Sequence, residues 1–189
     1  MEICNVVSSF KIPVSVDIKH ICKELRPIAS RKSSFPAVNL KLYTADLCQI
    51  FSNGKMIIIG GRSVAQNYAL FEDYVQLLHY LGYDFPAQQP QVQNIIAKCS
   101  HSTRINLLKF AAVRDVKDII SYEPEVFPAI RYRLDGLKIT INIFHTGKCM
   151  VLGAKSTADL IKAQASLRKL LQAVPPFRGK DGSYGQNCH

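Results

Sequence analysis

This chain contains two pairs of segments that carry aromatic, amide and basic residues in the same order. The first pair is FPAVNLKL from Phe35 and QIFSNGKMIIIGGRS over 49–63, and the second is FPAIRYRL from Phe127 and NIFHTGKCMVLGAKS over 142–156. Lysine and arginine neutralise phosphates, amides hydrogen bond to base edges, and aromatic rings stack on bases or wedge between them. These residue types on one surface therefore favour a nucleic-acid-binding site.

The spacing of the matched residues indicates an internal repeat. Phe127 follows Phe35 by 92 residues, and QNII from Gln93 follows CNVV from Cys4 by 89. Such regular self-similarity is typical of a duplicated structural unit, here of about ninety residues. We therefore predict two repeats, 1–90 and 91–174, followed by a Gly-rich polar tail over 175–189 that is expected to be disordered.

Within each repeat the residues alternate between two kinds of face, as they do along β-strands. One face is aliphatic and is expected to pack on helices. The other mixes aromatic, basic and amide side chains, which is unsuitable for a core and too aromatic for a surface without a ligand. Its members are Phe35, Asn39, Lys41, Gln49, Phe51, Lys55, Ile57 and Ile59 in the first repeat, and Phe127, Arg131, Arg133, Asn142, Phe144, Lys148, Met150 and Leu152 in the second.

Capping and turn residues predict the elements that hold these faces. Asp17 is expected to begin one helix, Ser63 a second that ends near Leu81, and Ser156 or Thr157 a third. The sequence Ser-Asn-Gly at 52–54 predicts a tight hairpin, because glycine and asparagine tolerate the positive φ that such turns need. The stripe Leu70, Tyr74, Leu77, Leu78 and Leu81 is expected to pack on the sheet.

Composition and charge restrict the class of protein. The chain has 189 residues, 48% of them hydrophobic and 20% charged, which is ordinary for a globular protein. Its net charge is +10, of which +2 falls in residues 1–90 and +8 in 91–189, and this favours a polyanionic partner. No apolar run is long enough to cross a membrane and no secretory signal is evident, so we expect an intracellular protein without a membrane partner.

Enzymatic activity and metal binding are not indicated. The six cysteines, at 4, 22, 48, 99, 149 and 188, show neither CxxC pairs nor the spacing of zinc ligands. The five histidines are dispersed, and there is no carboxylate cluster, no Ser/His/Asp set and no phosphate-binding loop. We therefore predict no catalytic residues, no metal and no cofactor.

The whole of residues 2–173 resembles the core of the TATA-box-binding protein family. The resemblance is carried by CNVV and QNII, the two FPA strands, IFSNGKM and IFHTGKC, GGRS and GAKS, and above all SYEPEVFPAIRYR at 121–133. It implies an α+β saddle, in which two pseudo-symmetric repeats form a curved antiparallel sheet of about ten strands with four helices on the convex side. It also implies minor-groove binding with intercalating wedges and a kinked duplex, the known behaviour of this family.

The resemblance also assigns roles to individual residues. Phe35 with Phe51, and Phe127 with Phe144, match the kinking pairs. For any single position a core phenylalanine or a solvated lysine is the commoner role, but the symmetric recurrence at eight or more positions favours DNA binding. The other matched residues are Asn5 and Asn94 for central base pairs, Val7, Ile57, Ile96 and Met150 for the groove, and Lys41, Asn53, Lys55, Arg131, Arg133, Thr146 and Lys148 for the rim and phosphates.

Two symmetric departures concern base recognition. Typical members carry threonine at the positions of Ile59 and Leu152, and leucine at those of Gln49 and Asn142. Isoleucine and leucine fill an A·T groove without bonding its acceptors, whereas the amides can donate to these acceptors or accept from the guanine amino group. We therefore expect DNA bending with an altered or relaxed TATA preference.

The expected protein partners differ between the repeats. Tyr122, Glu123 and Glu125 match the acidic docking site for a transcription factor IIB-like protein. The helix after Ser63 lacks the basic residues with which the family contacts other factors, which makes contact with a transcription factor IIA-like protein doubtful. An apolar groove face is also compatible with a homodimer of the DNA-free protein.

Two functions fit these observations. The first is a promoter-binding initiation factor, divergent or TATA-box-binding protein-like, that binds double-stranded promoter DNA. The second is an adaptor or regulator that acts mainly through protein partners and has weak DNA specificity. The four phenylalanines and the basic rim favour the first, and the altered groove residues keep the second open. The expected location is the nucleus, or a viral replication compartment if a virus encodes the chain.

Overall fold

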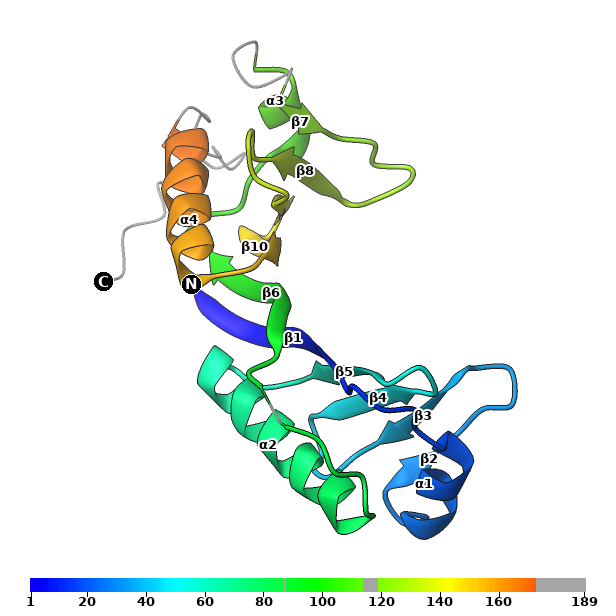
Figure 1. Ribbon diagram of the computed structural model, residues 1–189. Coiled ribbons are helices and arrows are strands. Elements are labelled where there is room, and N and C mark those ends of the chain that lie inside the picture. The colour runs from blue at the N-terminus through cyan, green and yellow to red at the C-terminus, as the bar shows by residue number, and fades with distance from the viewer. Residues whose placement is uncertain (87, 114–118, 173–189) are drawn as a thin grey trace. The chain divides into compact units, whose positions relative to one another are not determined.

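The computed structural model describes residues 1–86, 88–113 and 119–172. The chain divides into two compact units, one made of Ile3–Ile95 and the other of Ile96 onward together with Met1 and Glu2. The predicted disordered tail lies outside the described residues. Figure 1 shows the elements of both units, most of them labelled, and the units are described separately below.

The first unit is an antiparallel sheet covered by two helices. Its strands follow the order β2-β3-β4-β5-β1, and each neighbouring pair is antiparallel. Helices α1 and α2 contribute Ile21, Tyr74 and Leu78 to the same buried cluster as the strand residues, so both cover one face. The elements are β1 (Glu2–Lys11), α1 (Ile18–Glu24), β2 (Ala29–Ser30), β3 (Ala37–Leu40), β4 (Leu47–Phe51), β5 (Lys55–Ile59) and α2 (Val64–Tyr80).

The second unit repeats this arrangement with strands in the order β6-β10-β9-β8-β7. Its helices α3 and α4 contact β8 and β10 respectively, and both bury apolar side chains. The elements are β6 (Gln91–Ser100), α3 (Leu107–Ala111), β7 (Ile120–Ser121), β8 (Ala129–Arg133), β9 (Thr140–Phe144), β10 (Lys148–Ala154) and α4 (Thr157–Gln172), with the start of β6 belonging to the first unit.

The predicted alternation of faces is confirmed in both units. The aliphatic side of each sheet is buried, whereas the mixed side is partly or fully exposed except for two alanines. Ala37 and Ala129 are buried and lie directly across from Phe51 and Phe144. The buried aliphatic residues include Val6, Val38, Leu40, Cys48, Ile50, Met56 and Ile58 in the first unit, and Ala97, Ile130, Ile141, Ile143, Cys149 and Val151 in the second.

The hairpin turns depend on one glycine in each unit. Gly54 has φ +83° and its N–H donates to the Phe51 carbonyl at 2.9 Å; Gly147 has φ +84° and donates to Phe144 at 2.9 Å. A Cβ at Gly54 would lie 2.5 Å from the Ile12 carbonyl oxygen. Glycine is therefore required by both φ and space, and Asn53 does not adopt the left-handed conformation.

The predicted helix caps are confirmed. Asp17 accepts from the N–H groups of Lys19 and His20, and these bonds lower the pKa of its carboxyl group. Ser63 accepts from the Gln66 N–H at 3.1 Å, and α2 ends at Tyr80 as expected. At α4, Ser156 accepts from the Asp159 N–H at 3.1 Å while the Asp159 carboxylate accepts from the Ser156 N–H at 3.2 Å, which is a capping box.

The buried stripe of α2 lies slightly off the predicted one. Tyr74 and Leu78 are fully buried, but Phe71, Val75 and Asn67 are buried as well, and Leu70, Leu77 and Leu81 are only partly buried. Asn67 is satisfied because its amide donates to the carbonyls of Val6 and Gly60 and accepts from the Ser8 hydroxyl at 2.6 Å. These bonds join α2 to the sheet through polar groups as well as apolar ones.

Candidate nucleic-acid interface

The strand register of the first unit aligns the mixed face in rows across the sheet. One row contains Asn39, Gln49, Ile57 and Ser9, which pair in that order across β3, β4, β5 and β1. The next row contains Leu47, Ile59 and Val7. All of these side chains are partly exposed. The face therefore combines a polar row with an apolar one.

Each unit places two phenylalanines together on its mixed face. The ring centroids of Phe35 and Phe51 lie 5.9 Å apart with an interplanar angle of 60°, and those of Phe127 and Phe144 lie 6.1 Å apart at 61°. All four are partly exposed, and in each pair one residue lies at the end of a strand, before the hairpin turn. The rings stabilise each other at the edge of the face and are available to a ligand there.

Amide groups form two hydrogen-bonded links to residues of the first unit's mixed face. The Gln49 Nε2 donates to Asn39 Oδ1 at 3.1 Å, and the Gln93 Nε2 donates to the Ser9 hydroxyl at 2.9 Å. An amide carries two donor hydrogens, so the Gln49 amide keeps a second donor and its own carbonyl oxygen for a ligand. The links orient these groups in advance.

The second unit carries an arginine where the first has Asn39. The Arg131 guanidinium lies 4.7 Å from the centroid of the Phe127 ring, which is a cation–π contact. Arg131 also lies across from Asn142, which in turn lies across from Met150. Met150 is 37% exposed, and Leu152 pairs with Thr140 in the adjoining row. This face is thus more basic than that of the first unit.

Basic side chains border both faces. Lys41, Lys55, Arg133 and Lys148 are exposed. The Asn53 side chain accepts from the Lys55 backbone N–H at 2.9 Å, and the Thr146 hydroxyl accepts from that of Lys148 at 3.4 Å, so each turn residue fixes the backbone before its lysine. Their exposure suits phosphate contacts, for which a lysine is a mobile point charge.

Comparison with known proteins identifies the family of the chain. The family model "Transcription factor TFIID (or TATA-binding protein, TBP)" matches residues 1–81 and 89–174. The chain belongs to the TATA-binding protein family. It is similar to TATA-box-binding protein 2 of Entamoeba histolytica, with 30% identity over 173 residues, 91% of this chain and 81% of the relative.

Archaeal members of the TATA-binding protein family are similar too. The TATA-box-binding protein of Archaeoglobus fulgidus is 30% identical over 176 residues, 92% of this chain and 96% of the relative. The solved structure of Methanococcus jannaschii TBP superposes with a TM-score of 0.80 at 28% identity, covering 92% of this chain and 98% of that one. The predicted fold class is therefore confirmed as the TBP saddle fold, α+β with antiparallel strands.

The residues that the TATA-binding protein resemblance assigned to DNA are brought together within each unit. In the first unit they share the mixed face or its rim: Asn5, Val7, Phe35, Lys41, Gln49, Phe51, Asn53, Lys55, Ile57, Ile59 and, from the start of β6, Asn94. In the second unit the same holds for Ile96, Phe127, Arg131, Arg133, Asn142, Phe144, Thr146, Lys148, Met150 and Leu152. All of them are partly or fully exposed. Their DNA contacts remain predictions.

Sequence reasoning assigned no role to several neighbours on the same faces. Ser9 and Lys11 lie among the assigned residues of the first unit, Gln93 donates to Ser9, and Thr140 pairs with both Arg133 and Leu152 in the second unit. Strand parity identifies Ser9, Lys11 and Thr140, since every second residue of a strand shares a face. Gln93 has the parity of the buried Ile95 and is identified only by its hydrogen bond to Ser9.

The acidic segment predicted to bind a partner lies between β7 and β8. Glu123 and Glu125 are exposed and Tyr122 is partly buried. The Glu123 carbonyl accepts from the Phe127 N–H at 2.9 Å, which links this segment to one wedge phenylalanine. A cavity of about 410 Å³ beside it is lined by Tyr122, Pro124, Pro128 and His145 and by the first residues of α3. The acidic segment therefore borders a cavity that a partner's side chain could enter.

The described part of the chain offers no metal site and no helix that could span a membrane. No three His, Cys, Asp or Glu residues within it lie close enough together to hold a metal ion. None of its helices is both long and apolar enough to cross a bilayer. Both results concern residues 1–86, 88–113 and 119–172 only.

Proposed function

We propose that this member of the TATA-binding protein family is a transcription initiation factor that binds the minor groove of promoter DNA and kinks it. Phe35 with Phe51 would wedge into one base step, and Phe127 with Phe144 into another. Unstacking costs on the order of a few kcal/mol per step, which the enlarged contact surface offsets. The protein performs no catalysis in this role and acts as a platform.

The observation that supports the proposal most is the placement of the two phenylalanine pairs. Each pair lies at the exposed edge of a mixed face, on the side of the sheet opposite to the buried aliphatic residues. Rings buried beneath the helices could not reach a base step. The exposed lysines and arginines at the rims supply the electrostatic attraction that any duplex binding requires.

The groove that is read can be tested with inosine substitution. An I·C pair presents the same minor-groove acceptors as A·T, without the guanine amino group, but a different major groove. We expect an A·T-rich duplex and its I·C-substituted counterpart to bind within about twofold of each other, and the G·C counterpart to bind more weakly. Loss of binding on I·C substitution would contradict minor-groove recognition.

The altered groove residues lead to a prediction about specificity. Selection from random duplexes should return a consensus other than the standard TATA element, because Ile59 and Leu152 cannot hydrogen bond to base acceptors. Changing both to threonine, Ile59→Thr with Leu152→Thr, should raise the preference for TATA over the selected site. Each new hydrogen bond contributes about 1 kcal/mol, or roughly fivefold in affinity. An unchanged TATA consensus from the wild-type protein would count against this.

The acidic segment leads to a prediction about partners. We propose that Glu123 and Glu125 dock a transcription factor IIB-like protein. The double variant Glu123→Arg with Glu125→Arg should reduce ternary-complex formation at least about tenfold, because it replaces attraction by repulsion, and should leave binding to DNA alone intact. Gel mobility shift with both components measures this. An unaffected ternary complex would refute the docking site.

The helix-side surface of α2 does not favour a transcription factor IIA-like partner. Its exposed or partly exposed residues include Glu72, Asp73, Gln76 and Tyr80, and residues 63–86 contain no lysine or arginine.

The nucleus is the proposed location, with a viral replication compartment as the alternative. A homodimer of the free protein and a mainly protein-binding adaptor role also remain open predictions. An adaptor would bind its partners without bending DNA.

A further inference from the structure

Two lysines lie directly across from each other at the edge of the first unit's mixed face. Lys11, the last residue of β1, pairs with Lys55, the first residue of β5. Strand parity places Lys11 on the same face as Ser9, and Lys55 on the same face as Ile57. Like charges that are directly opposite in a sheet are unfavourable in the absence of a compensating anion. The pair therefore calls for an explanation.

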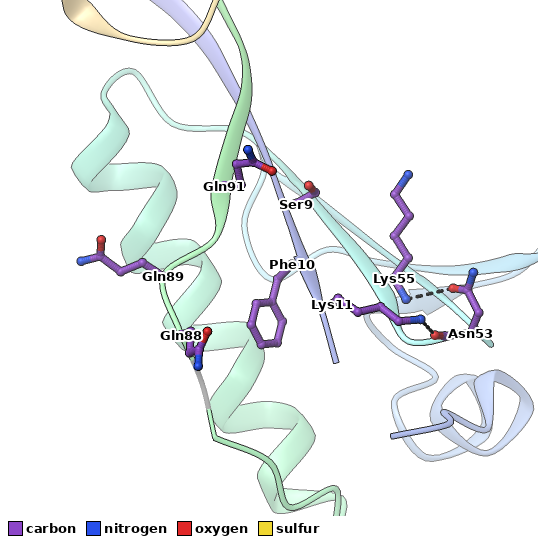
Figure 2. Close-up of a pocket in the computed structure, with 8 residues that line it drawn as sticks. All are labelled: Ser9, Phe10, Lys11, Asn53, Lys55, Gln88, Gln89 and Gln91. Carbon is purple, nitrogen blue, oxygen red and sulfur yellow. Dashed lines mark hydrogen bonds between the residues drawn. The ribbon is translucent and has the colours of Figure 1, made fainter. Parts of the chain in front are cut away.

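The hairpin turn holds both lysines. The Lys11 ammonium donates to the Asn53 carbonyl oxygen, while the Asn53 side chain accepts from the Lys55 backbone N–H. A lysine ammonium has three donor hydrogens, so two on Lys11 remain for a ligand. Figure 2 shows Lys11 reaching to Asn53 and the Lys55 side chain extending away from it. In the protein without a ligand, the two ammonium groups therefore point away from each other.

An open cavity of about 490 Å³ adjoins the two lysines, a volume within the usual range of ligand sites. Its other lining residues supply amide and hydroxyl groups (Figure 2). They are Ser9, Asn53, Gln88, Gln89 and Gln91, with Phe10 as the apolar member. Two cations and several neutral hydrogen-bonding groups, with no carboxylate among the lining residues, are suited to an anion.

The second unit lacks this pair. The bond from the Ile12 N–H to the Gly54 carbonyl, 2.8 Å, has a counterpart from His101 to Gly147, also 2.8 Å. Since His101 matches Ile12, the residue that matches Lys11 is Ser100, so the second unit has a serine where the first has a lysine. Lys55 and Lys148 are matched residues of the two repeats, whereas Lys11 has no matching lysine in the second repeat.

We infer that Lys11 and Lys55 together bind a backbone phosphate of the duplex, beside the step into which Phe51 is inserted. This inference rests on the proposed function. Ile50 pairs with Met56, so Phe51 at the end of β4 lies next to the start of β5, and the phosphate site adjoins the wedge. A phosphate between the lysines neutralises their repulsion.

The test is the salt dependence of duplex binding by Lys11→Ser, which introduces the residue of the second unit. Each phosphate neutralised contributes about 0.9 to the slope of log K against log salt concentration. We expect the slope to fall by about 1 and the affinity at low salt to fall roughly five- to tenfold. The matched control is Lys19→Ser, which removes the same charge from an exposed position on α1 and should leave the slope unchanged.

A reciprocal variant strengthens the test. Ser100→Lys places a lysine at the position that matches Lys11 and should raise the slope by about 1. Equal slopes for wild type, Lys11→Ser and Lys19→Ser, in a wild-type protein that binds and bends DNA, would overturn this inference alone. A wild-type protein that binds no duplex would overturn the proposed function as well.

Discussion

The variant Phe35→Ala with Phe51→Ala is expected to lose the kink at one end of the bound DNA and to bind at least about tenfold more weakly. Stacking of an aromatic ring on a base contributes about 1–3 kcal/mol, and this variant removes two rings. The pair lies at an exposed edge of the sheet, so its loss should affect DNA more than folding. Energy transfer between dyes at the duplex ends measures the bend, and fluorescence anisotropy measures the affinity.

Two controls distinguish wedging from general loss of apolar surface. Phe35→Leu with Phe51→Leu keeps apolar side chains that can enter a base step and should retain part of the bend. Val126→Ala removes an exposed apolar side chain, 71% accessible, that lies outside the four wedges, and should leave the bend unchanged. A full bend in the double alanine variant would refute the role of this pair.

The variant Tyr74→Phe is expected to lower the free energy of unfolding by about 2–4 kcal/mol. The Tyr74 hydroxyl is buried; it donates to the Asp46 carboxylate, accepts from the Leu42 N–H at 3.1 Å, and lies 3.1 Å from the Leu40 carbonyl. Burial and the carboxylate raise the pKa of Tyr74, so the hydroxyl stays protonated. Its removal leaves a buried carboxylate short of a donor, and such a loss costs about 1–3 kcal/mol or more for a charged group.

Urea denaturation measures this loss. Tyr80→Phe is the matched control, because Tyr80 is on the same helix and 85% exposed, and it should change stability by less than about 0.5 kcal/mol. Asp46 also accepts from the Tyr43 N–H at 2.7 Å, so the same group orders the β3–β4 connection that begins with Lys41. An unchanged midpoint for Tyr74→Phe would show that this network does not stabilise the fold.

Much of the fold could be predicted because strand parity and helix caps are local signals. The assignment of Phe51 and Ile50 to opposite faces needed only a period of two, and Asp17 and Ser63 were identified by residue type and position. The positions of α3, β2 and β7 could not be predicted from periodicity, because five residues are too few to show a helical period and two are too few to show alternation.

Other features needed the register or distant contacts. The bond between Gln49 and Asn39 depends on which residues of β3 and β4 face each other, and turns alone do not specify this for strands joined by a longer connection. The Tyr74 contact with Asp46 joins residues 28 apart. The position of Lys11 opposite Lys55 depends on the pairing of β1 with β5, which residues 44 apart in the sequence do not reveal.

The most direct test of the central claim is energy transfer across a short A·T-rich duplex, with dyes at its two ends, as the wild-type protein is added. We predict that transfer increases with saturation, because paired wedges kink the duplex and bring its ends together. Anisotropy of the same duplex reports binding independently. Saturable binding with no change in transfer would contradict the account, because it would show that the four phenylalanines do not enter base steps.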